Sequence, residues 1–155
     1  MKFSSKEDIE APIEHVFGAV SEFEAFERMA IRRGAEVQRI IDIPGPKAGI
    51  TWQADFRMRG KDRAAKVELV SYDSPNEMAF EFVSGGLLGY LDVDLVALSP
   101  RRTRMSVGFE LKPQTLPARL LVQSLKLAKS NLTKKFQLRV ADYAKTMEER
   151  YTRMA

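Results

Sequence analysis

Apolar and polar residues alternate through most of the first 112 positions, which is the pattern of strands with one buried face. The clearest case is segment 50–59, in which polar residues alternate with Ile50, Trp52, Ala54, Phe56 and Met58. Turns rich in Pro, Gly, Asp or Asn, such as residues 44–49, separate these segments. The pattern predicts seven strands, over residues 2–10, 35–42, 50–59, 63–72, 78–82, 90–98 and 103–112.

Helical spacing replaces the alternation in two regions. Pro12 suits the first turn of a short helix, and Ser21 with Glu24 predicts the capping box of a second helix, which Gly34 ends. Beyond Pro117 the apolar residues recur at intervals of three and four, and no further Gly or Pro follows. We therefore expect one continuous C-terminal helix of about 35 residues, roughly 50 Å long.

The order of these elements predicts an α+β fold. Consecutive strands joined by short turns favour a seven-stranded antiparallel sheet. A long amphipathic helix can then cover the open face of that sheet. At 155 residues the chain has the length of one domain, and we expect residues 1–155 to form a single one.

The local sequence around the first predicted helix resembles a known superfamily. Residues 9–17 (Ile-Glu-Ala-Pro-Ile-Glu-His-Val-Phe), followed by Phe23 and Phe26, look like the strand-to-helix entry of the START/Bet v 1-like (SRPBCC) proteins. They are similar in particular to the bacterial polyketide cyclase/dehydrase-like members, and the resemblance covers nearly the whole chain. It implies the helix-grip fold, in which the sheet curls around the C-terminal helix and leaves an apolar cavity. Members bind lipids, sterols, polyketides or quinones, and some catalyse cyclisation or dehydration.

Apolar side chains on the strand faces and on the C-terminal helix are candidates to line that cavity. The alternative is that they fill an ordinary core, because an apolar strand face is normally packed. The candidate lining residues are Trp52, Phe56, Phe80, Phe82, Phe109, Leu121, Leu125 and Leu132.

Charged residues also occupy the apolar phase of three strands: Glu7, Arg39 and Arg63. A charge on a buried face needs a partner. Taking the first and second strands as neighbours, we expect Glu7 and Arg39 to form an ion pair at one end of the cavity. The alternative places each charge at the rim. Tyr90 is a further candidate for an inward polar group.

Other residues that often carry chemistry have more ordinary interpretations here. The lone histidine, His15, is expected at the surface or rim rather than as a general base. Asp92 and Asp94 share one strand face opposite leucine and valine, so they are expected to face solvent. The glycine-rich loop 83–89 is either a gate over the cavity or a flexible hairpin linker.

Composition and charge narrow the function further. The absence of cysteine excludes disulfides and thiolate chemistry, and one histidine cannot build a His/Cys zinc site, so no metal or cofactor is expected.

The net charge of +4 is unevenly distributed along the chain, since residues 116–155 hold nine Lys or Arg against three Asp or Glu. This basic segment suits an anionic membrane surface or an acidic partner, whereas nucleic acid is not expected because no aromatic platform accompanies it. No apolar run reaches membrane-spanning length and the first ten residues do not resemble a signal peptide, which predicts a cytoplasmic location.

Three functional hypotheses remain open at this point. The leading one is binding of a hydrophobic small molecule (a lipid, polyketide or quinone-like compound) between sheet and C-terminal helix. The second is a polyketide cyclase or dehydratase, for which Glu7, Arg63 and Tyr90 are the candidate acids or bases. The third is an accessory or chaperone-like protein that acts through the basic helix.

Overall fold

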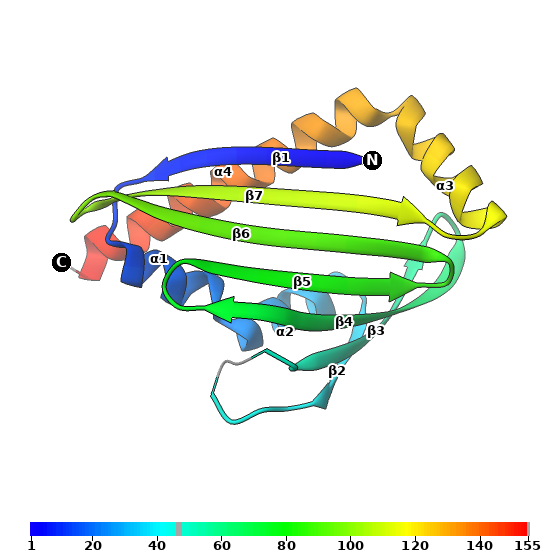
Figure 1. Ribbon diagram of the computed structural model, residues 1–155, viewed down its shortest axis with the longest axis horizontal. Coiled ribbons are helices and arrows are strands. Elements are labelled where there is room, and N and C mark those ends of the chain that lie inside the picture. The colour runs from blue at the N-terminus through cyan, green and yellow to red at the C-terminus, as the bar shows by residue number, and fades with distance from the viewer. Residues whose placement is uncertain (46–47, 155) are drawn as a thin grey trace.

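One antiparallel sheet of seven strands is present within residues 1–45 and 48–154, the part of the chain that the computed structural model describes (Figure 1). Its strands are β1 (Lys2–Ile9), β2 (Glu36–Ile41), β3 (Thr51–Met58), β4 (Lys61–Asp73), β5 (Glu77–Ser84), β6 (Leu87–Ser99) and β7 (Arg102–Pro113). The predicted α+β class and seven antiparallel strands are confirmed, although the turn expected at residues 44–49 lies partly outside the described residues.

The order of the strands across the sheet is β1-β7-β6-β5-β4-β3-β2. Strands β2 to β7 follow one another as neighbours, and β1 is added beside β7. The first two strands therefore form opposite edges of the sheet. The expectation that they are adjacent is wrong, because alternation indicates which residues face inward and does not indicate which strands pair at the edges.

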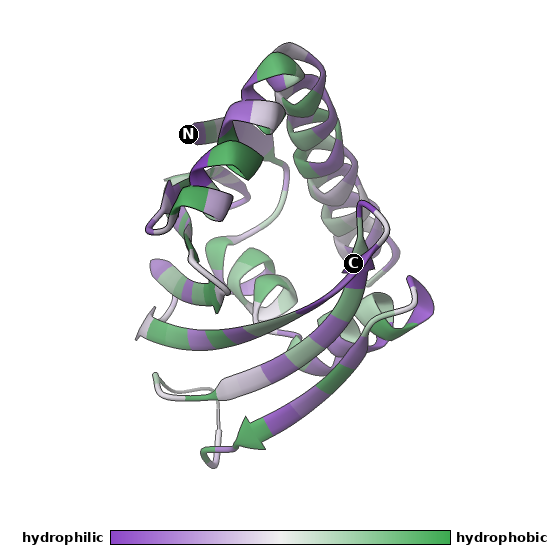
Figure 2. Ribbon diagram, turned by 90° about the vertical axis from the view of Figure 1, so that its right-hand side faces the viewer, coloured by the Kyte–Doolittle hydropathy of each residue, from purple (hydrophilic) through white to green (hydrophobic). Residues whose placement is uncertain are grey.

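Burial follows the same period of two as the sequence, since successive strand residues point to opposite faces. In β6, Val93 and Leu95 are buried while Asp92 and Asp94 are exposed. The inner face of the sheet is covered by helices and the outer face meets solvent (Figure 2).

Two short helices, α1 (Ile13–Val20) and α2 (Phe23–Arg32), connect β1 to β2, as predicted. The expected capping box is absent, because the Ser21 hydroxyl donates to the Phe17 carbonyl oxygen (2.7 Å) and the N-cap of α2 is Glu22.

The C-terminal helix is divided into α3 (Leu116–Leu127) and α4 (Lys129–Met154), so the prediction of one continuous helix is wrong. The break falls at Ala128, where the backbone φ and ψ are −107° and 16°. A straight helix over segments of 12 and 26 residues would extend about 57 Å, whereas the 13-residue strands span about 43 Å. The break lets α3 turn over the ends of the hairpins instead of leaving the sheet (Figure 1).

The loop expected at residues 83–89 is a tight hairpin. Strand β5 ends at Ser84 and β6 begins at Leu87, so the turn itself is Gly85-Gly86. The Gly86 carbonyl oxygen accepts a hydrogen bond from the Gln114 amide (2.7 Å), and a Cβ at Gly86 would lie 2.1 Å from the Thr115 hydroxyl oxygen. The segment is thus the hairpin of the second interpretation, and it packs closely against the start of α3.

The core consists of two clusters. The larger lies between the sheet, α1 and α4, and its largest fully buried side chains are Ile9, Val16, Ile50, Leu69, Met78, Met105 and Met147. The smaller lies under α3 and contains Leu87, Leu111, Ala118 and Val122.

Thr103 ties the start of β7 to the segment between β1 and α1. Its side chain is fully buried and donates to the Ala11 carbonyl oxygen (2.8 Å). We expect Thr103→Val to lower the free energy of unfolding by about 1–3 kcal/mol, because it leaves a buried acceptor without a donor. Urea denaturation measures this loss. Thr103→Ser keeps the hydroxyl and should lose less, and a Val variant as stable as the wild type would contradict the assignment.

Candidate functional site

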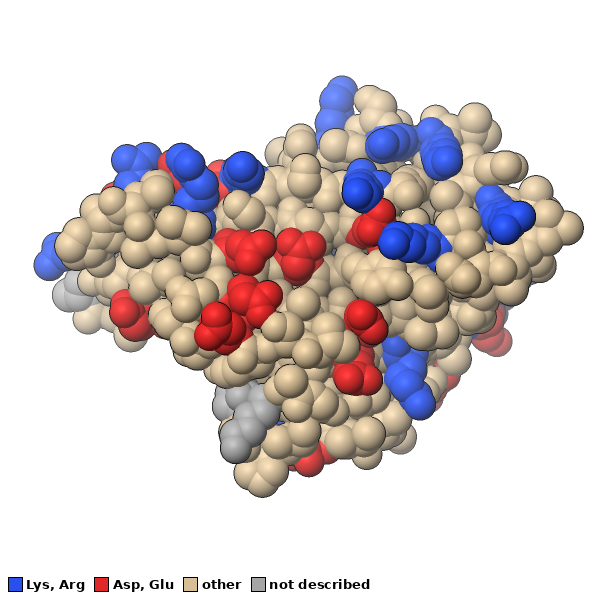
Figure 3. Space-filling view, in the orientation of Figure 1, with Lys and Arg blue, Asp and Glu red and all other residues tan. Residues whose placement is uncertain are grey.

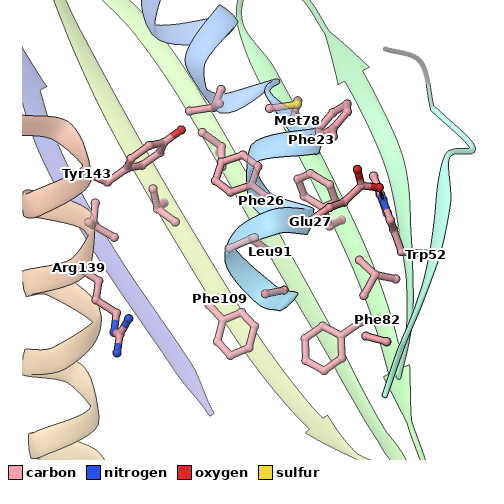
Figure 4. Close-up of a pocket in the computed structure, with 18 of the residues that line it drawn as sticks. Phe23, Phe26, Glu27, Trp52, Met78, Phe82, Leu91, Phe109, Arg139 and Tyr143 are labelled. Atoms are coloured by element: carbon pink, nitrogen blue, oxygen red, sulfur yellow. Dashed lines mark hydrogen bonds between the residues drawn. The ribbon is translucent and has the colours of Figure 1, made fainter. Parts of the chain in front are cut away.

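A cavity of about 560 Å³ lies between the inner face of the sheet and helices α2 and α4 (Figure 4). Strands β2 to β7 contribute to its wall, and so do α1, α2 and α4. Most of its lining side chains are apolar, and the aromatic ones are Phe23, Phe26, Trp52, Phe80, Phe82, Phe109, Phe136 and Tyr143.

Aromatic contacts hold much of this wall against the sheet. Trp52 meets Phe23 and Phe80, with ring centroids 5.5 and 6.2 Å apart. Phe82 stacks on Phe109 at 5.7 Å. The ring of Phe82 also occupies the space over Gly89, where a Cβ would lie 1.8 Å from the ring. Such pairs fix ring positions beyond what area burial alone does, so the rings stay on the wall and the space between sheet and helices remains open.

The structure brings four of the eight predicted lining residues together on the wall: Trp52, Phe80, Phe82 and Phe109. Phe56 and Leu132 are half-buried and are not among the lining residues. Leu121 and Leu125 pack against the smaller core cluster and are not among the lining residues. Their displacement follows from the break at Ala128, which turns α3 over the hairpin ends.

Arg39 is paired, but its partners are on α2 and not on β1. Its Nε and one terminal nitrogen each lie 3.0 Å from the Glu27 carboxylate, and the other terminal nitrogen lies 3.2 Å from Asp42. These hydrogen bonds, led by those to Glu27, raise the pKa of Arg39. The expected Glu7–Arg39 ion pair is wrong because the two residues lie on opposite edges of the sheet.

Glu27 was not identified from the sequence, although it is the polar centre of this edge. Its carboxylate also accepts a hydrogen bond from Trp52 Nε1 (2.8 Å), and the Arg39 guanidinium lies over the Trp52 ring at 5.8 Å. A signal for it exists in the helix periodicity: Phe23, Phe26, Glu27 and Ala30 share one face of α2, and all four line the cavity.

The other candidate inward groups are not among the lining residues. Glu7 is half-buried on β1, opposite Met105. Arg63 is half-buried near the β3–β4 turn and donates from Nε to the Met58 carbonyl oxygen (3.3 Å). Tyr90 lies on the outer face of β6, where the Lys112 ammonium sits over its ring at 5.2 Å. Its position on the outer face follows from the alternation, since the next residue, Leu91, lines the cavity.

Helix α4 contributes two polar side chains to the wall. The Tyr143 hydroxyl donates to the Ala19 carbonyl oxygen (3.0 Å), and burial, followed by the nearby Glu22 charge, raises the pKa of Tyr143. Arg139 lines the cavity from an exposed position (Figure 4). Among the residues that the structure describes, no hydrogen-bond or ion-pair partner is found for the Arg139 guanidinium.

The remaining candidates lie away from the cavity. His15 Nε2 is 3.2 Å from the Met147 carbonyl oxygen, and its ring contacts Tyr151 edge-on, so this half-buried side chain joins α1 to α4. Asp92 and Asp94 are exposed on the outer face of β6, and acidic side chains gather over the middle of the face seen in Figure 3. Partial burial, and then the charges of Asp92 and Glu77, raise the pKa of Asp94.

The chemistry available inside the cavity is therefore limited. Its ionisable lining residues are Glu27, Arg139 and Tyr143. Three donor groups already occupy the Glu27 carboxylate, and the Tyr143 hydroxyl already donates to the Ala19 carbonyl oxygen. In the described part of the chain there is also no group of three His, Cys, Asp or Glu residues that could hold a metal ion. The arrangement is suited to enclosing an apolar molecule.

Comparison with known proteins identifies the fold. No family model matches the sequence, and no curated relative matches it. Solved structures do match. The protein TTHA0849 from Thermus thermophilus has a TM-score of 0.65 and 16% identity, and the match covers 100% of this chain and 99% of that one.

Two further neighbours carry informative descriptions. The Zhui aromatase/cyclase from Streptomyces sp. R1128 has a TM-score of 0.66 at 10% identity and covers 97% and 94% of the two chains. A START superfamily protein from Mycobacterium smegmatis has a TM-score of 0.62 at 15% identity and covers 99% of both. The chain has the START/Bet v 1-like helix-grip fold. At these identities the likeness concerns the fold alone. Within the residues described for this helix-grip chain, no helix is long and apolar enough to span a membrane.

The environment of Tyr143 predicts an unusual alkaline titration. Because the pKa of Tyr143 is raised in the folded protein, its neutral form contributes to the free energy of unfolding. This contribution is fully present below the ordinary tyrosine pKa near 10 and is lost as the pH rises above that value. Tyrosinate absorbance is recorded for the wild type, which has four tyrosines, and for Tyr143→Phe. We expect the difference curve, which isolates Tyr143, to rise only above pH 10. A midpoint at the ordinary value would contradict the assigned environment.

Proposed function

We propose that this protein binds a hydrophobic small molecule, such as a lipid, polyketide or quinone-like compound, in the cavity between the sheet and α4. The observation that carries the proposal is an apolar space of about 560 Å³ that the protein's own aromatic side chains leave open. Ligand pockets typically occupy about 300–1,000 Å³ and combine apolar walls with a few polar groups. Closely packed cores hold few voids larger than a water molecule, which makes a filled core the weaker interpretation of this wall.

Binding is better supported than catalysis. General acid–base catalysis needs a group that can exchange a proton with the substrate at the working pH. Of the ionisable lining residues, Glu27 is held by Arg39 and Trp52, and Tyr143 donates to the backbone. An aromatase/cyclase occurs among the structural neighbours, but at 10% identity its activity carries no weight for this chain.

The affinity of such a site comes mainly from apolar area removed from water. Each buried methylene of a ligand contributes about 0.8 kcal/mol, less the cost of immobilising the molecule. The wall is already assembled from stacked rings, so little reorganisation is needed before a ligand enters.

Filling the cavity tests the proposal. Leu91 lines the cavity from β6, whereas its neighbour Tyr90 lies on the outer face, so Leu91→Trp and Tyr90→Trp form a matched pair. The neutral fluorescent compound N-phenyl-1-naphthylamine serves as the probe. We expect Leu91→Trp to weaken its binding roughly tenfold or more, a loss of about 1.4 kcal/mol, while Tyr90→Trp binds as the wild type does.

Native mass spectrometry of protein purified without detergent complements this test. A co-purifying hydrophobic compound that is lost in Leu91→Trp supports the proposal. Failure of the wild type to bind the probe, or equal binding by both variants, counts against it.

Helix α3 supports a second part of the proposal, contact with an anionic membrane surface. Three leucines on this helix, Leu116, Leu120 and Leu127, are 68%, 57% and 92% exposed. Their spacing of four and seven places them on one stripe, opposite the face that packs into the smaller core cluster. Contiguous exposed apolar side chains of this kind typically mark a site where a protein contacts a membrane or a partner.

Positive charge accompanies the stripe. Arg119 and Lys126 lie between the exposed leucines and the buried face of α3, and Lys129 begins the next helix. Basic side chains gather over the same end of the molecule (Figure 3). An amphipathic helix with leucines on one face and basic residues beside them fits the boundary of an anionic bilayer, and the aromatic platform that single-stranded nucleic acid would need is not part of it.

Vesicle binding tests this surface. Co-sedimentation with vesicles of phosphatidylcholine plus phosphatidylserine is compared with phosphatidylcholine alone. We expect the double variant Leu120→Gln, Leu127→Gln to reduce binding to the anionic vesicles about tenfold, since each leucine loses part of its apolar contribution.

The matched control is Leu98→Gln, which changes an exposed leucine on β6. This variant should bind the vesicles as the wild type does. Unchanged binding by the double variant would contradict the proposal. So would a concentration-dependent dimer that the double variant abolishes, because a second copy of the chain would then cover the stripe.

A further inference from the structure

Arg139 is the single positively charged side chain among the described residues that line the cavity. It shares one face of α4 with two other lining residues, Phe136 and Tyr143, which lie three and four positions away. Helix geometry therefore directs Arg139 toward the cavity, unlike the lysines at positions 134 and 135 on the same helix, which do not line it.

The guanidinium of Arg139 is also free. The structure gives it no carboxylate or carbonyl partner within the described residues, although a guanidinium offers five donors. Arg39, near the opposite side of the cavity, is different because Glu27, Asp42 and Glu24 all lie within ion-pair distance of it. Glu27 is thereby paired with Arg39, whereas Arg139 has no carboxylate opposite it among the described residues of the wall.

The exposure of Arg139 shows which part of the wall it occupies. Its side chain is exposed while the adjacent Val140 is 8% exposed, so Arg139 lies where the cavity meets solvent. A ligand carboxylate at this point can keep part of its hydration, which avoids the large cost of burying an ion. Its apolar body would extend from there along Leu91, Phe82 and Phe109 (Figure 4).

We infer that the ligand is amphipathic and anionic: an apolar molecule with a carboxylate at one end, which Arg139 binds at the cavity mouth. The inference rests on the proposed binding function and specifies its ligand class. The planar fork of a guanidinium matches a carboxylate in a bidentate pair, which a neutral alcohol or ester cannot form.

Dodecanoate and 1-dodecanol provide the test, since they differ only in the head group. Each is titrated against N-phenyl-1-naphthylamine bound to the protein near neutral pH, and the ratio of the two dissociation constants is the readout. We expect Arg139→Gln to weaken dodecanoate binding about tenfold and to leave dodecanol binding unchanged, so that the ratio shifts by about tenfold. This is the lower end of what hydrogen bonds to a charged group contribute. Arg139→Lys should retain part of the preference, and high salt should reduce it in the wild type.

Lys135→Gln is the control, because it removes the same charge from the same helix at an exposed position outside the lining. Its ratio should equal that of the wild type.

Equal shifts in both variants would mean that the general electrostatic field of the helix acts. No shift in either variant would mean that the head group lies elsewhere. Both results overturn the inference and leave cavity binding intact. If Arg63→Gln abolishes the preference and Arg139→Gln does not, the inference is overturned as well. Failure of the wild type to bind the probe or either compound would instead overturn the proposed function.

Discussion

The carboxylate of Glu27 holds one side of the cavity in place. Helix α2 buries a single side chain, Phe23, so packing alone fixes it weakly. Glu27 accepts hydrogen bonds from Trp52 on β3 and from Arg39 on β2, and this ties α2 to the two strands that form the far edge of the sheet. Charge-assisted hydrogen bonds of this kind are directional and strong when partly buried. They set the distance between α2 and the sheet, and the open volume depends on that distance.

The opposite side depends on α4, which packs along β1 at the other edge. Phe136 of α4 contacts Phe3 with ring centroids 6.0 Å apart, and Tyr143 is anchored to the carbonyl oxygen of Ala19 at the end of α1. The two edges of a curled sheet are thus held by separate helices, one through ionic hydrogen bonds and one through aromatic packing. Neither helix fills the space between them. The cavity therefore exists because the two helices lie at opposite edges of the curled sheet, and its aromatic lining determines its shape.

Much of the architecture could be predicted from alternation, because burial on a strand has the same period as the sequence; Trp52 and Phe80 were assigned to the correct face in this way. The positions of β1 and β2 at opposite edges could not, since nothing local encodes which strands form the edges. The break at Ala128 could not be predicted either, because no Gly or Pro marks it. Glu27 lies on the periodic face of α2, but its role required the strand register that sets Arg39 opposite Trp52.

The positive and negative charges of the chain lie on different parts of the folded molecule. Acidic side chains gather over the middle of the face seen in Figure 3, and one of its two groups of basic side chains lies at the α3 end. Asp94 on β6 is close to Asp92 and Glu77. An anionic surface would attract the α3 end and repel the sheet, and such fields orient a protein before contact. The same positive end carries the exposed leucines, and Arg139 follows on the next helix at the mouth of the cavity. A field that draws an anionic surface to α3 also raises the local concentration of anionic amphiphiles beside that mouth, so one distribution of charge favours both the surface and the ligand.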